Sequence, residues 1–375
     1  MNVGLVVQNA VRRDGQGRVM VELTEALLER GHEITVYAHQ LDDNLAQRVT
    51  FHEIRRARGP QVVDDVLMFL RATRAIRRGG HDAACVLGHC ALPEVPWLFN
   101  VQFSHQGWRR SWTPASRPSW KHRLSTRVAE RLERRCFQRA TRVLASTERL
   151  ASELGSRDGV RVVPNGLDLD EFSPVTPAER ADARVELGIE PDRFVIAFLG
   201  DYQTPRKGLE PLLGAVASGP PDEMLVVAAR GDDGALVARA RSLGIADRVT
   251  AIGFAPPKLV YAAADVVAVP SLYEPFSLVT LEAAARCVPV VVSARAGAAP
   301  LLDGGGHIVD RPEEPGALRA AIDGVRADRE DAAARVRVAR AAVEGLTWRV
   351  VAGHAATVIE ELAHEVGARQ RATLP

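Results

Sequence analysis

Lysine, cysteine and long apolar runs are all scarce in this sequence. Only Lys121, Lys207 and Lys258 are lysines among 48 basic residues, so a lysine beside a glycine turn is an unusual feature. Four cysteines in 375 residues are too few for a disulfide framework and favour reduced thiols in a cytosolic protein. No apolar stretch approaches the roughly 18 residues that span a bilayer. The short apolar run at the N-terminus precedes its arginines, unlike a signal peptide. We expect a soluble, cytoplasmic protein.

Short β-branched runs alternate with longer amphipathic segments along the whole chain. Strands are expected at 3–7, 34–38, 84–87, 98–103, 142–145 and 161–163, with a first helix at 18–30. After a Pro-Asn-Gly turn at 164–166 and a proline-containing linker, strands are expected at 194–199, 224–229, 265–270, 288–293 and 307–309. C-terminal helices should run through Trp348 to about Val366, followed by a disordered tail. This alternation predicts parallel sheets covered on both faces.

The length of 375 residues exceeds that of a usual single core. We therefore predict an α/β protein with two Rossmann-like, doubly wound domains, 1–166 and 167–352. Ligands should bind at the carboxyl ends of strands that face a cleft between them.

Two glycine-containing turns follow the first strands of these predicted domains. Gly15 and Gly17 open the first helix, where glycine lets backbone N–H groups approach an anion at the positive end of the helix dipole. A purely conformational role for these glycines is the alternative. Arg206 and Lys207 precede Gly208 after the strand at 194–199. Two cations at the start of a helix are repelled by the positive end of its dipole. A bound diphosphate would offset this repulsion and would explain why the cations are there.

Seven residues separate Glu274 from Glu282 after the strand at 265–270. If a helix begins near Ser277, Glu282 lies in its second turn and Glu274 in the preceding loop, so both could face one ligand. The carboxylates could accept hydrogen bonds from sugar hydroxyls, whereas the helix start could bind phosphate. The N–H groups available for phosphate are those of Phe276, Ser277, Leu278 and Val279. A capping role for Glu274 is the alternative.

His105 follows the strand at 98–103 and should also reach the cleft. A histidine that is simply packed or exposed is the alternative interpretation.

The chain resembles the retaining glycosyltransferases of the GT-B fold. The matching stretches are Val162 to Phe172, the turn from Arg206 to Gly208, Tyr261 to Asp265, and the spacing of Glu274 and Glu282. The resemblance implies a C-terminal helix at about 353–370 that returns to the first domain. It also implies a nucleotide-diphosphate sugar as donor, a UDP- or GDP-sugar first of all, and no cofactor. The acceptor would be a hydroxyl of a glycolipid, a saccharide or a natural product.

The resemblance further assigns a role to each candidate residue. Arg206 and Lys207 would bind the donor diphosphate, Glu282 the ribose and Glu274 the transferred sugar. Gly15 would lie near the distal phosphate or donor sugar, and His105 near the reacting sugar.

The sequence departs from the family pattern at three positions. Asp201 stands where many relatives have arginine, Ser277 stands where glycine is usual, and Asp14-Gly15 replaces a double glycine. These changes could alter the choice of donor.

A metal site is not expected. Asp168 and Asp170 match the carboxylate pair of metal-dependent transferases, but they fall in the predicted linker. The fragment Cys85 to Cys90, which includes His89, has no second ligand pair at zinc-like spacing.

The segment from Trp108 to Arg142 is strongly basic, although the whole chain has a net charge of only +1. Eleven arginines and lysines accompany only Glu130 and Glu133, with Trp108, Trp112 and Trp120 interleaved. This composition suits an anionic membrane interface or an anionic acceptor. A solvated helix face over aromatic core residues is the alternative. Nucleic-acid binding is not expected because no recognition motif accompanies the charge.

Two other enzyme classes use similar domains. A GT-B sugar-nucleotide epimerase would share the whole fold. A nicotinamide-dependent oxidoreductase is less compatible, because the sequence lacks a tight Gly-x-Gly-x-x-Gly turn.

Overall fold

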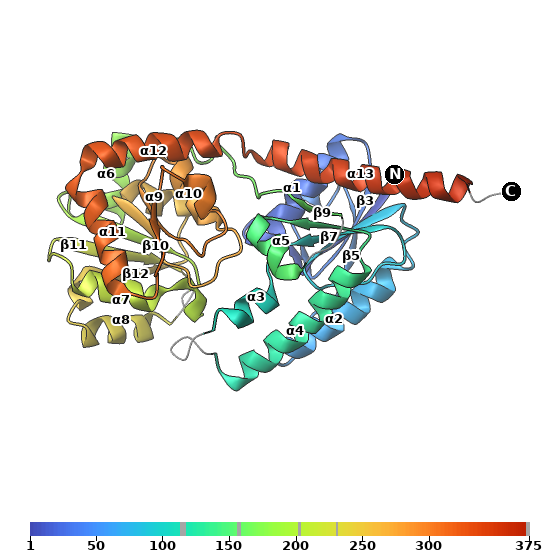
Figure 1. Cartoon of the computed structure of the whole chain (residues 1–375), viewed down its shortest axis with the longest axis horizontal. Helices are drawn as coiled ribbons and strands as arrows, with labels where there is room; N and C mark the ends of the chain where they lie inside the picture. The colour runs from blue at the N-terminus through green and yellow to red at the C-terminus, as the bar shows by residue number, and fades with distance from the viewer. Residues whose placement is uncertain (113–117, 156–158, 202–203, 230–231, 373–375) are drawn as a thin grey trace. The chain divides into compact units, whose positions relative to one another are not determined.

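The computed structural model describes residues 1–112, 118–155, 159–201, 204–229 and 232–372, with side chains described as far as residue 365. These residues form two compact units. The first contains Met1–Trp112, Pro118–Gly166 and the segment from Trp348 onward, and the second contains Leu167–Thr347. Each unit has a parallel sheet with helices packed on it (Figure 1). The predicted fold class of two Rossmann-like α/β sheets is therefore confirmed.

The seven strands of the first sheet are all parallel. In spatial order they are β5 (Thr50–Glu53), β3 (Glu33–Ala38), β1 (Asn2–Val6), β6 (Ala83–Leu87), β7 (Trp97–Val101), β8 (Arg142–Ala145) and β9 (Val160–Val162). Two short strands, β2 (Asn9–Ala10) and β4 (Gln40–Leu41), pair separately. Strand β5 was not predicted, because its four residues are all exposed at the sheet edge and lack an apolar pattern.

The helices of the first unit lie in two groups. Their bounds are α1 (Gly15–Glu29), η1 (Asp43–Leu45), α2 (Gln61–Ile76), α3 (His105–Arg110), α4 (Trp120–Arg139), α5 (Glu148–Leu154) and α13 (Trp348–Ala372). Residues from α2, α4 and α5 share one hydrophobic cluster with the sheet. The last helix, α13, packs against α1 and also contacts β6 and β7.

Helix α13 joins the first unit although it follows the whole second unit in sequence (Figure 1). Arg30 donates to Glu360 at 2.6 Å and to the carbonyl of Gly353 at 2.7 Å, and His32 contacts Glu360 at 2.7 Å. The returning helix is therefore confirmed. Helix α13 continues to Ala372. The prediction of a disordered tail after about Val366 is therefore wrong for residues 367–372.

The six strands of the second sheet are also parallel. In spatial order they are β12 (Val249–Gly253), β11 (Glu223–Ala228), β10 (Phe194–Leu199), β13 (Val266–Val269), β14 (Val290–Ser293) and β15 (His307–Val309). Helices and turns of this unit are α6 (Pro177–Glu186), η2 (Pro205–Lys207), α7 (Leu209–Ala217), α8 (Asp233–Ser242), η3 (Ala246–Arg248), α9 (Pro257–Ala263), α10 (Leu278–Ala285), η4 (Ala299–Leu302), α11 (Pro315–Ala327) and α12 (Arg329–Val343). Strand β12 was not predicted.

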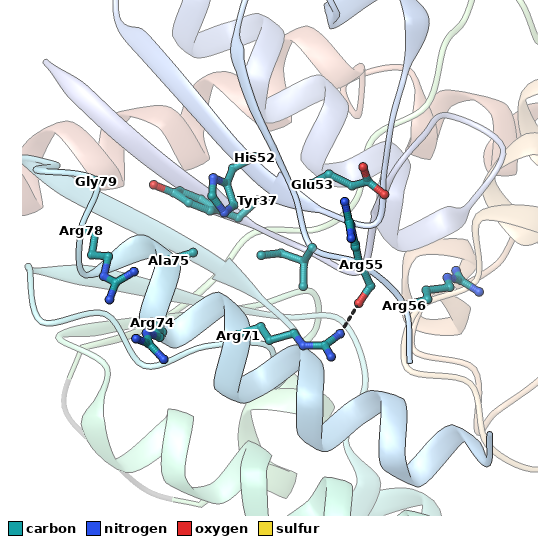
Figure 2. A pocket seen from close by; sticks show the side chains of 11 residues that line it. Tyr37, His52, Glu53, Arg55, Arg56, Arg71, Arg74, Ala75, Arg78 and Gly79 are labelled. Carbon is teal, nitrogen blue, oxygen red and sulfur yellow. Dashed lines mark hydrogen bonds between the residues drawn. The ribbon is translucent and has the colours of Figure 1, made fainter. Parts of the chain in front are cut away.

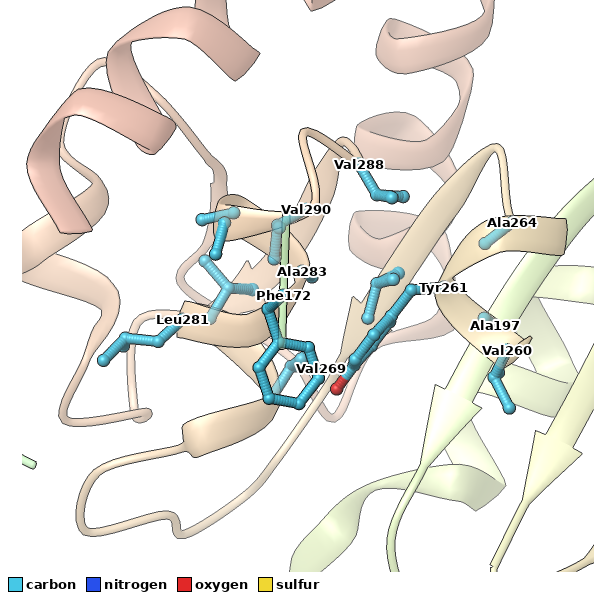
Figure 3. Close-up of a cluster of buried hydrophobic side chains, with 14 of the residues drawn as sticks. Phe172, Ala197, Val260, Tyr261, Ala264, Val269, Leu281, Ala283, Val288 and Val290 are labelled. Atoms are coloured by element: carbon cyan, nitrogen blue, oxygen red, sulfur yellow. The ribbon is translucent and has the colours of Figure 1, made fainter. Parts of the chain in front are cut away.

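Side chains of β10 alternate between the two faces of the sheet, as the two-residue period of a strand requires. Val195 and Ala197 belong to a cluster that includes Tyr261 of α9 (Figure 3). Ile196 and Phe198 belong to the cluster on the other face. The continuous apolar strand is thus explained by burial on both sides.

Among the described residues, no helix is both long enough and apolar enough to cross a membrane.

Candidate active site

Arg206 and Lys207 lie in the short turn η2, which follows β10 and leads into α7. The backbone carbonyl of Arg206 accepts hydrogen bonds from the N–H groups of Leu272, at 2.7 Å, and of Tyr273, at 3.3 Å. Gly208 ends the turn with a φ of 74°, and a Cβ there would lie 2.0 Å from the carbonyl oxygen of Pro270. Glycine is therefore required for the close approach that brings both cations beside the loop after β13.

Glu274 lies in that loop and contacts both cations with the same oxygen. Its Oε2 accepts from Nη1 of Arg206 at 3.2 Å and from Nζ of Lys207 at 2.5 Å. Burial raises the pKa of the Glu274 carboxyl, but the charges and hydrogen bonds of Lys207 and Arg206 outweigh this effect, so the pKa is lowered overall. The three side chains form a partly buried ionic cluster, in which one carboxylate contacts two cations.

Helix α10 starts directly after this cluster. Its N-cap is Ser277, whose hydroxyl accepts from the N–H of Thr280 at 3.3 Å and from the Thr280 hydroxyl at 2.8 Å. The capping alternative for Glu274 is thus wrong. Ser277 has a φ of 95°, a region that L-residues other than glycine rarely adopt. This explains why glycine is usual here in the family that the sequence resembles. The amide groups of Phe276, Ser277 and Leu278 stand at the positive end of the helix dipole.

Glu282 lies in α10, as expected, and is held by a residue of α9. The hydroxyl of Tyr261 donates to Oε2 of Glu282 at 2.7 Å. The Tyr261 side chain is fully buried against Phe172 (Figure 3). Burial, the negative charge of Glu282 and the hydrogen bond raise the pKa of Tyr261 well above its usual value. The hydroxyl therefore remains a hydrogen-bond donor and orients this carboxylate.

The glycine turn of the first unit is capped by its own aspartate. Oδ1 of Asp14 accepts from the N–H groups of Gln16 at 3.0 Å and of Gly17 at 3.3 Å. A Cβ on Gly17 would lie 2.5 Å from the carbonyl oxygen of Asn9 and 2.6 Å from that of Val11. This geometry favours the conformational role for Gly17, because a carboxylate already lies where its N–H points.

His105 is the first residue of α3, beyond the carboxyl end of β7. Its backbone N–H donates to Oε2 of Glu133 at 3.0 Å, and its Nδ1 lies 2.7 Å from the same oxygen. The Glu133 side chain is only 6% exposed, whereas that of His105 is 21% exposed. Glu133 therefore fixes the ring through Nδ1 and leaves Nε2 for another partner.

A second histidine packs on the first. The rings of His89 and His105 are 5.1 Å apart in a T-shaped arrangement. Burial, aided by the positive charge of His105, lowers the pKa of His89 to about 3. Its Nε2 is buried and has no hydrogen-bond partner within the described parts of the chain. His89 follows β6, the neighbour of β7, which is why the two rings meet.

Two groups missed by the sequence analysis thus orient its candidates. Glu133 was noted only as a counter-charge in the basic segment, and Tyr261 only as part of a family motif. Neither has a local sequence signal, because each contact joins separate helices.

The residues considered as metal ligands have other partners or are scattered. Asp168 Oδ1 accepts from the N–H groups of Asp170, at 3.0 Å, and Glu171, at 2.9 Å, as in a turn cap. Cys85 and Cys90 are buried free thiols. Within the described ranges no group of three or more His, Cys, Asp or Glu side chains could hold a metal ion.

The basic segment is only partly available to a ligand, and Thr113 to Arg117 lie outside the described residues. Trp108 is buried in the unit, so the expectation that it could seat at a membrane is wrong. Arg142 pairs with Glu361 of α13. Trp120 is 68% exposed. The exposed residues of α4 form a stripe that includes Trp120, Leu124, Arg127, Arg131 and Arg135.

Comparison with known protein families gives two matches that together cover both units. A model described as Glycosyltransferase Family 4 matches residues 13–171, and one described as Glycosyl transferases group 1 matches residues 193–328. D-inositol 3-phosphate glycosyltransferase from Mycobacterium sp. (strain KMS) is 41% identical over 181 residues, which cover 44% of this chain and 40% of that protein. The same enzyme from Nocardia farcinica is 36% identical over 221 residues, covering 52% and 48%. The chain therefore spans less than half the length of these curated relatives.

Solved structures share the fold over nearly the whole chain. WaaG, a glycosyltransferase involved in lipopolysaccharide biosynthesis, has a TM-score of 0.82 at 18% identity, covering 95% of this chain and 99% of that chain. Anabaena HepE, in complex with UDP and glucose, has a TM-score of 0.75 at 20% identity, covering 96% and 100%. From its two family matches and its fold, the chain belongs to the group 1, or family 4, glycosyltransferases, a retaining class with the GT-B fold.

Proposed function

We propose that this protein transfers a sugar from a nucleotide-diphosphate sugar to an acceptor hydroxyl, with retention of the anomeric configuration and without a metal ion. The observation that carries the proposal is the partly buried cluster of Arg206, Lys207 and Glu274 shortly before α10. An enzyme that releases a diphosphate needs positive charge where the leaving group becomes more negative. Two cations and a helix start supply it here.

In this proposal Glu274 acts as a counter-ion that a donor can replace. The diphosphate competes with Glu274 for Arg206 and Lys207, and the carboxylate is then free to accept hydrogen bonds from sugar hydroxyls. The N–H groups of Phe276, Ser277 and Leu278 bind phosphate oxygens. Glu282, oriented by Tyr261, accepts from the ribose hydroxyls.

His105 and the first glycine turn are assigned to the sugar. Glu133 holds His105 through Nδ1, so Nε2 can contact a sugar or acceptor hydroxyl. Gly15 remains a candidate for contact with the distal phosphate or donor sugar. The role proposed for Gly17 is to let α1 pack closely on the preceding turn.

The donor is proposed to be a UDP- or GDP-sugar. Because structures of HepE, which shares the fold, contain UDP or UDP-glucose, UDP-sugars are the first donors to test. The acceptor class stays a hydroxyl of a glycolipid, a saccharide or a natural product.

The first test is a thermal-shift screen of UDP-, GDP-, ADP- and TDP-sugars, followed by calorimetry with the best donor. Arg206→Gln should weaken donor binding roughly tenfold or more, as expected for a lost charged hydrogen bond. The control is Arg239→Gln, which removes an exposed ion pair with Glu210 in the same unit and should not change affinity. Equal affinity in the two variants would contradict the diphosphate assignment.

The second test is the stereochemistry of transfer. An α-linked donor should give an α-linked product by NMR, and an inverted anomer would contradict retention. Turnover of the sugar nucleotide without an acceptor product would instead support an epimerase.

We also propose peripheral contact with an anionic membrane at its cytoplasmic face through the exposed stripe of α4, which is the part of the basic segment Trp108 to Arg142 that remains accessible. The exposed stripe of α4 supports this, because Trp120 and Leu124 lie at one end and arginines follow. Aromatic and basic residues in this order suit a headgroup interface.

A further inference from the structure

An arginine-lined pocket of about 720 Å³ lies on the first unit (Figure 2). None of its lining residues belongs to the candidate active site. Five of the eleven are arginines, and the full lining is Tyr37, His52, Glu53, Ile54, Arg55, Arg56, Arg71, Arg74, Ala75, Arg78 and Gly79. A volume of this size falls in the range of small-molecule sites.

The fold gathers these arginines from two elements that are separate in sequence. Arg55 follows edge strand β5 just beyond its carboxyl end, α2 carries Arg71 and Arg74, and Arg78 lies two residues beyond the end of that helix. The spacing of three residues places Arg71 and Arg74 on one face of α2. Arg71 donates to the carbonyl of Arg55 at 2.6 Å, which ties the helix to the loop (Figure 2).

The remaining walls are aromatic and apolar. Tyr37 of β3 and His52 of β5 are direct neighbours across the sheet, with ring centroids 5.3 Å apart. Ile54 is buried in the same hydrophobic cluster as Tyr37. The wall opposite the arginines can therefore pack against the non-ionic part of a ligand.

The charge in this pocket is far from balanced. Glu53 is the only acidic residue among the lining side chains, whereas the whole chain has 48 basic and 47 acidic residues. Among the ion pairs of the described residues, none joins Arg55, Arg74 or Arg78 to a carboxylate. Arg77, by contrast, pairs with Glu94 at 3.1 Å and does not line the pocket. Arg56 donates to Asn9 at 2.9 Å.

We propose that this pocket is a second anion site, which binds a ligand carrying several phosphate charges. Arginine forks match phosphate oxygens in pairs, and five clustered arginines beside a single carboxylate create a positive local potential. Such a ligand is distinct from the donor, and the proposal does not rest on the transferase activity. The phosphates could belong to a free metabolite or to a lipid headgroup, and the chemistry of recognition is the same.

The test is calorimetric titration of the full chain with inorganic tripolyphosphate at low and physiological salt. It is performed on Arg206→Gln/Lys207→Gln protein, so that binding at the proposed donor site is removed. In that background Arg78→Gln should weaken tripolyphosphate binding roughly tenfold. The matched control is Arg77→Gln, a neighbouring exposed arginine outside the pocket, which should stay within about twofold of the background affinity.

A second arm separates free phosphate from a lipid source. Vesicles of phosphatidylglycerol or of phosphatidylcholine are sedimented with each variant. Tripolyphosphate binding that only Arg78→Gln weakens supports a soluble ligand. Anionic vesicle binding that only Arg78→Gln weakens, without tripolyphosphate binding, supports a headgroup ligand. Equal effects of Arg77→Gln and Arg78→Gln, or no binding in either arm, would overturn the proposal. Unchanged circular dichroism of both variants confirms that they are folded.

Discussion

The backbone of Ser277 offers a test of how α10 is built, and two substitutions separate its contributions. Ser277 caps the helix with its hydroxyl while its φ is 95°. Ser277→Ala removes the hydroxyl and keeps a Cβ at positive φ. Ser277→Gly removes the same hydroxyl and the Cβ together. The difference between the two variants therefore contains the backbone strain, together with smaller differences in capping and in the entropy of the unfolded chain.

The expected magnitudes follow from the contacts. Losing the cap to alanine costs about 1 kcal/mol, whereas losing it to glycine costs only about 0.3 kcal/mol. A Cβ on a residue with positive φ costs about 1–2 kcal/mol, which glycine avoids. Glycine gives back about 0.4–1 kcal/mol of this gain, because it makes the unfolded chain more flexible. Ser277→Gly should thus be close to wild type in stability, and more stable than Ser277→Ala by roughly 1 kcal/mol.

Urea unfolding, followed by circular dichroism, measures this difference directly. A gap of about 1 kcal/mol corresponds to roughly 2–4 °C in melting temperature for a unit of this size. Equal stability of the two variants, or a more stable alanine variant, would refute the assignment of strain to this residue. It would also remove the physical reason for glycine at this position in relatives.

Four further outcomes are expected. Glu282→Ala should weaken nucleotide-diphosphate binding by roughly 1–3 kcal/mol, and unchanged calorimetric affinity would end the ribose assignment. Transfer activity should survive exhaustive EDTA treatment, whereas strict dependence on Mg²⁺ or Mn²⁺ would revive Asp168 as a ligand. Because the pKa of His89 is about 3 in the folded protein, the unfolded chain binds a proton first as the pH falls. The free energy of unfolding should therefore drop below about pH 6.5 by up to about 1.4 kcal/mol per pH unit. His89→Gln should flatten that slope, and an identical pH profile would show that burial does not depress this pKa. Phosphatidylglycerol vesicles should sediment the protein at low salt but not at high salt, and Trp120→Ser should reduce this binding. Equal partitioning into neutral vesicles would exclude an electrostatic contact.

Periodicity predicted the fold because most strands are buried on both faces. Runs such as Phe194–Leu199 and Arg142–Ala145 are apolar enough to mark strands with nearly correct ends. The strands that were missed in the two large sheets lie at edges, and neither has that pattern. Thr50–Glu53 is fully exposed, and Val249–Gly253 is mostly half-buried. An edge strand pairs on one side only, so its sequence is less constrained by packing.

The site could be predicted only where one segment holds the whole arrangement. Glu274 and Glu282 flank the start of a single helix, so their spacing in sequence indicates their spacing in the fold. Contacts between elements had no such signal. Nothing in the local sequence shows that Glu133 orients His105, or that Glu274 takes both Arg206 and Lys207 as partners.

The two candidate anion sites at helix starts look alike in sequence but differ in the charge of the capping residue. At α1 the cap is Asp14, whose carboxylate accepts the first free N–H groups and brings a negative charge to the positive end of the dipole. A phosphate there would displace or oppose that carboxylate. At α10 the cap is the neutral hydroxyl of Ser277, and the nearest carboxylate, Glu274, is already matched by two cations. A phosphate there would compete with Glu274 for those two cations. Electrostatics therefore favour the start of α10 over the start of α1 as the phosphate-binding end in the proposed function.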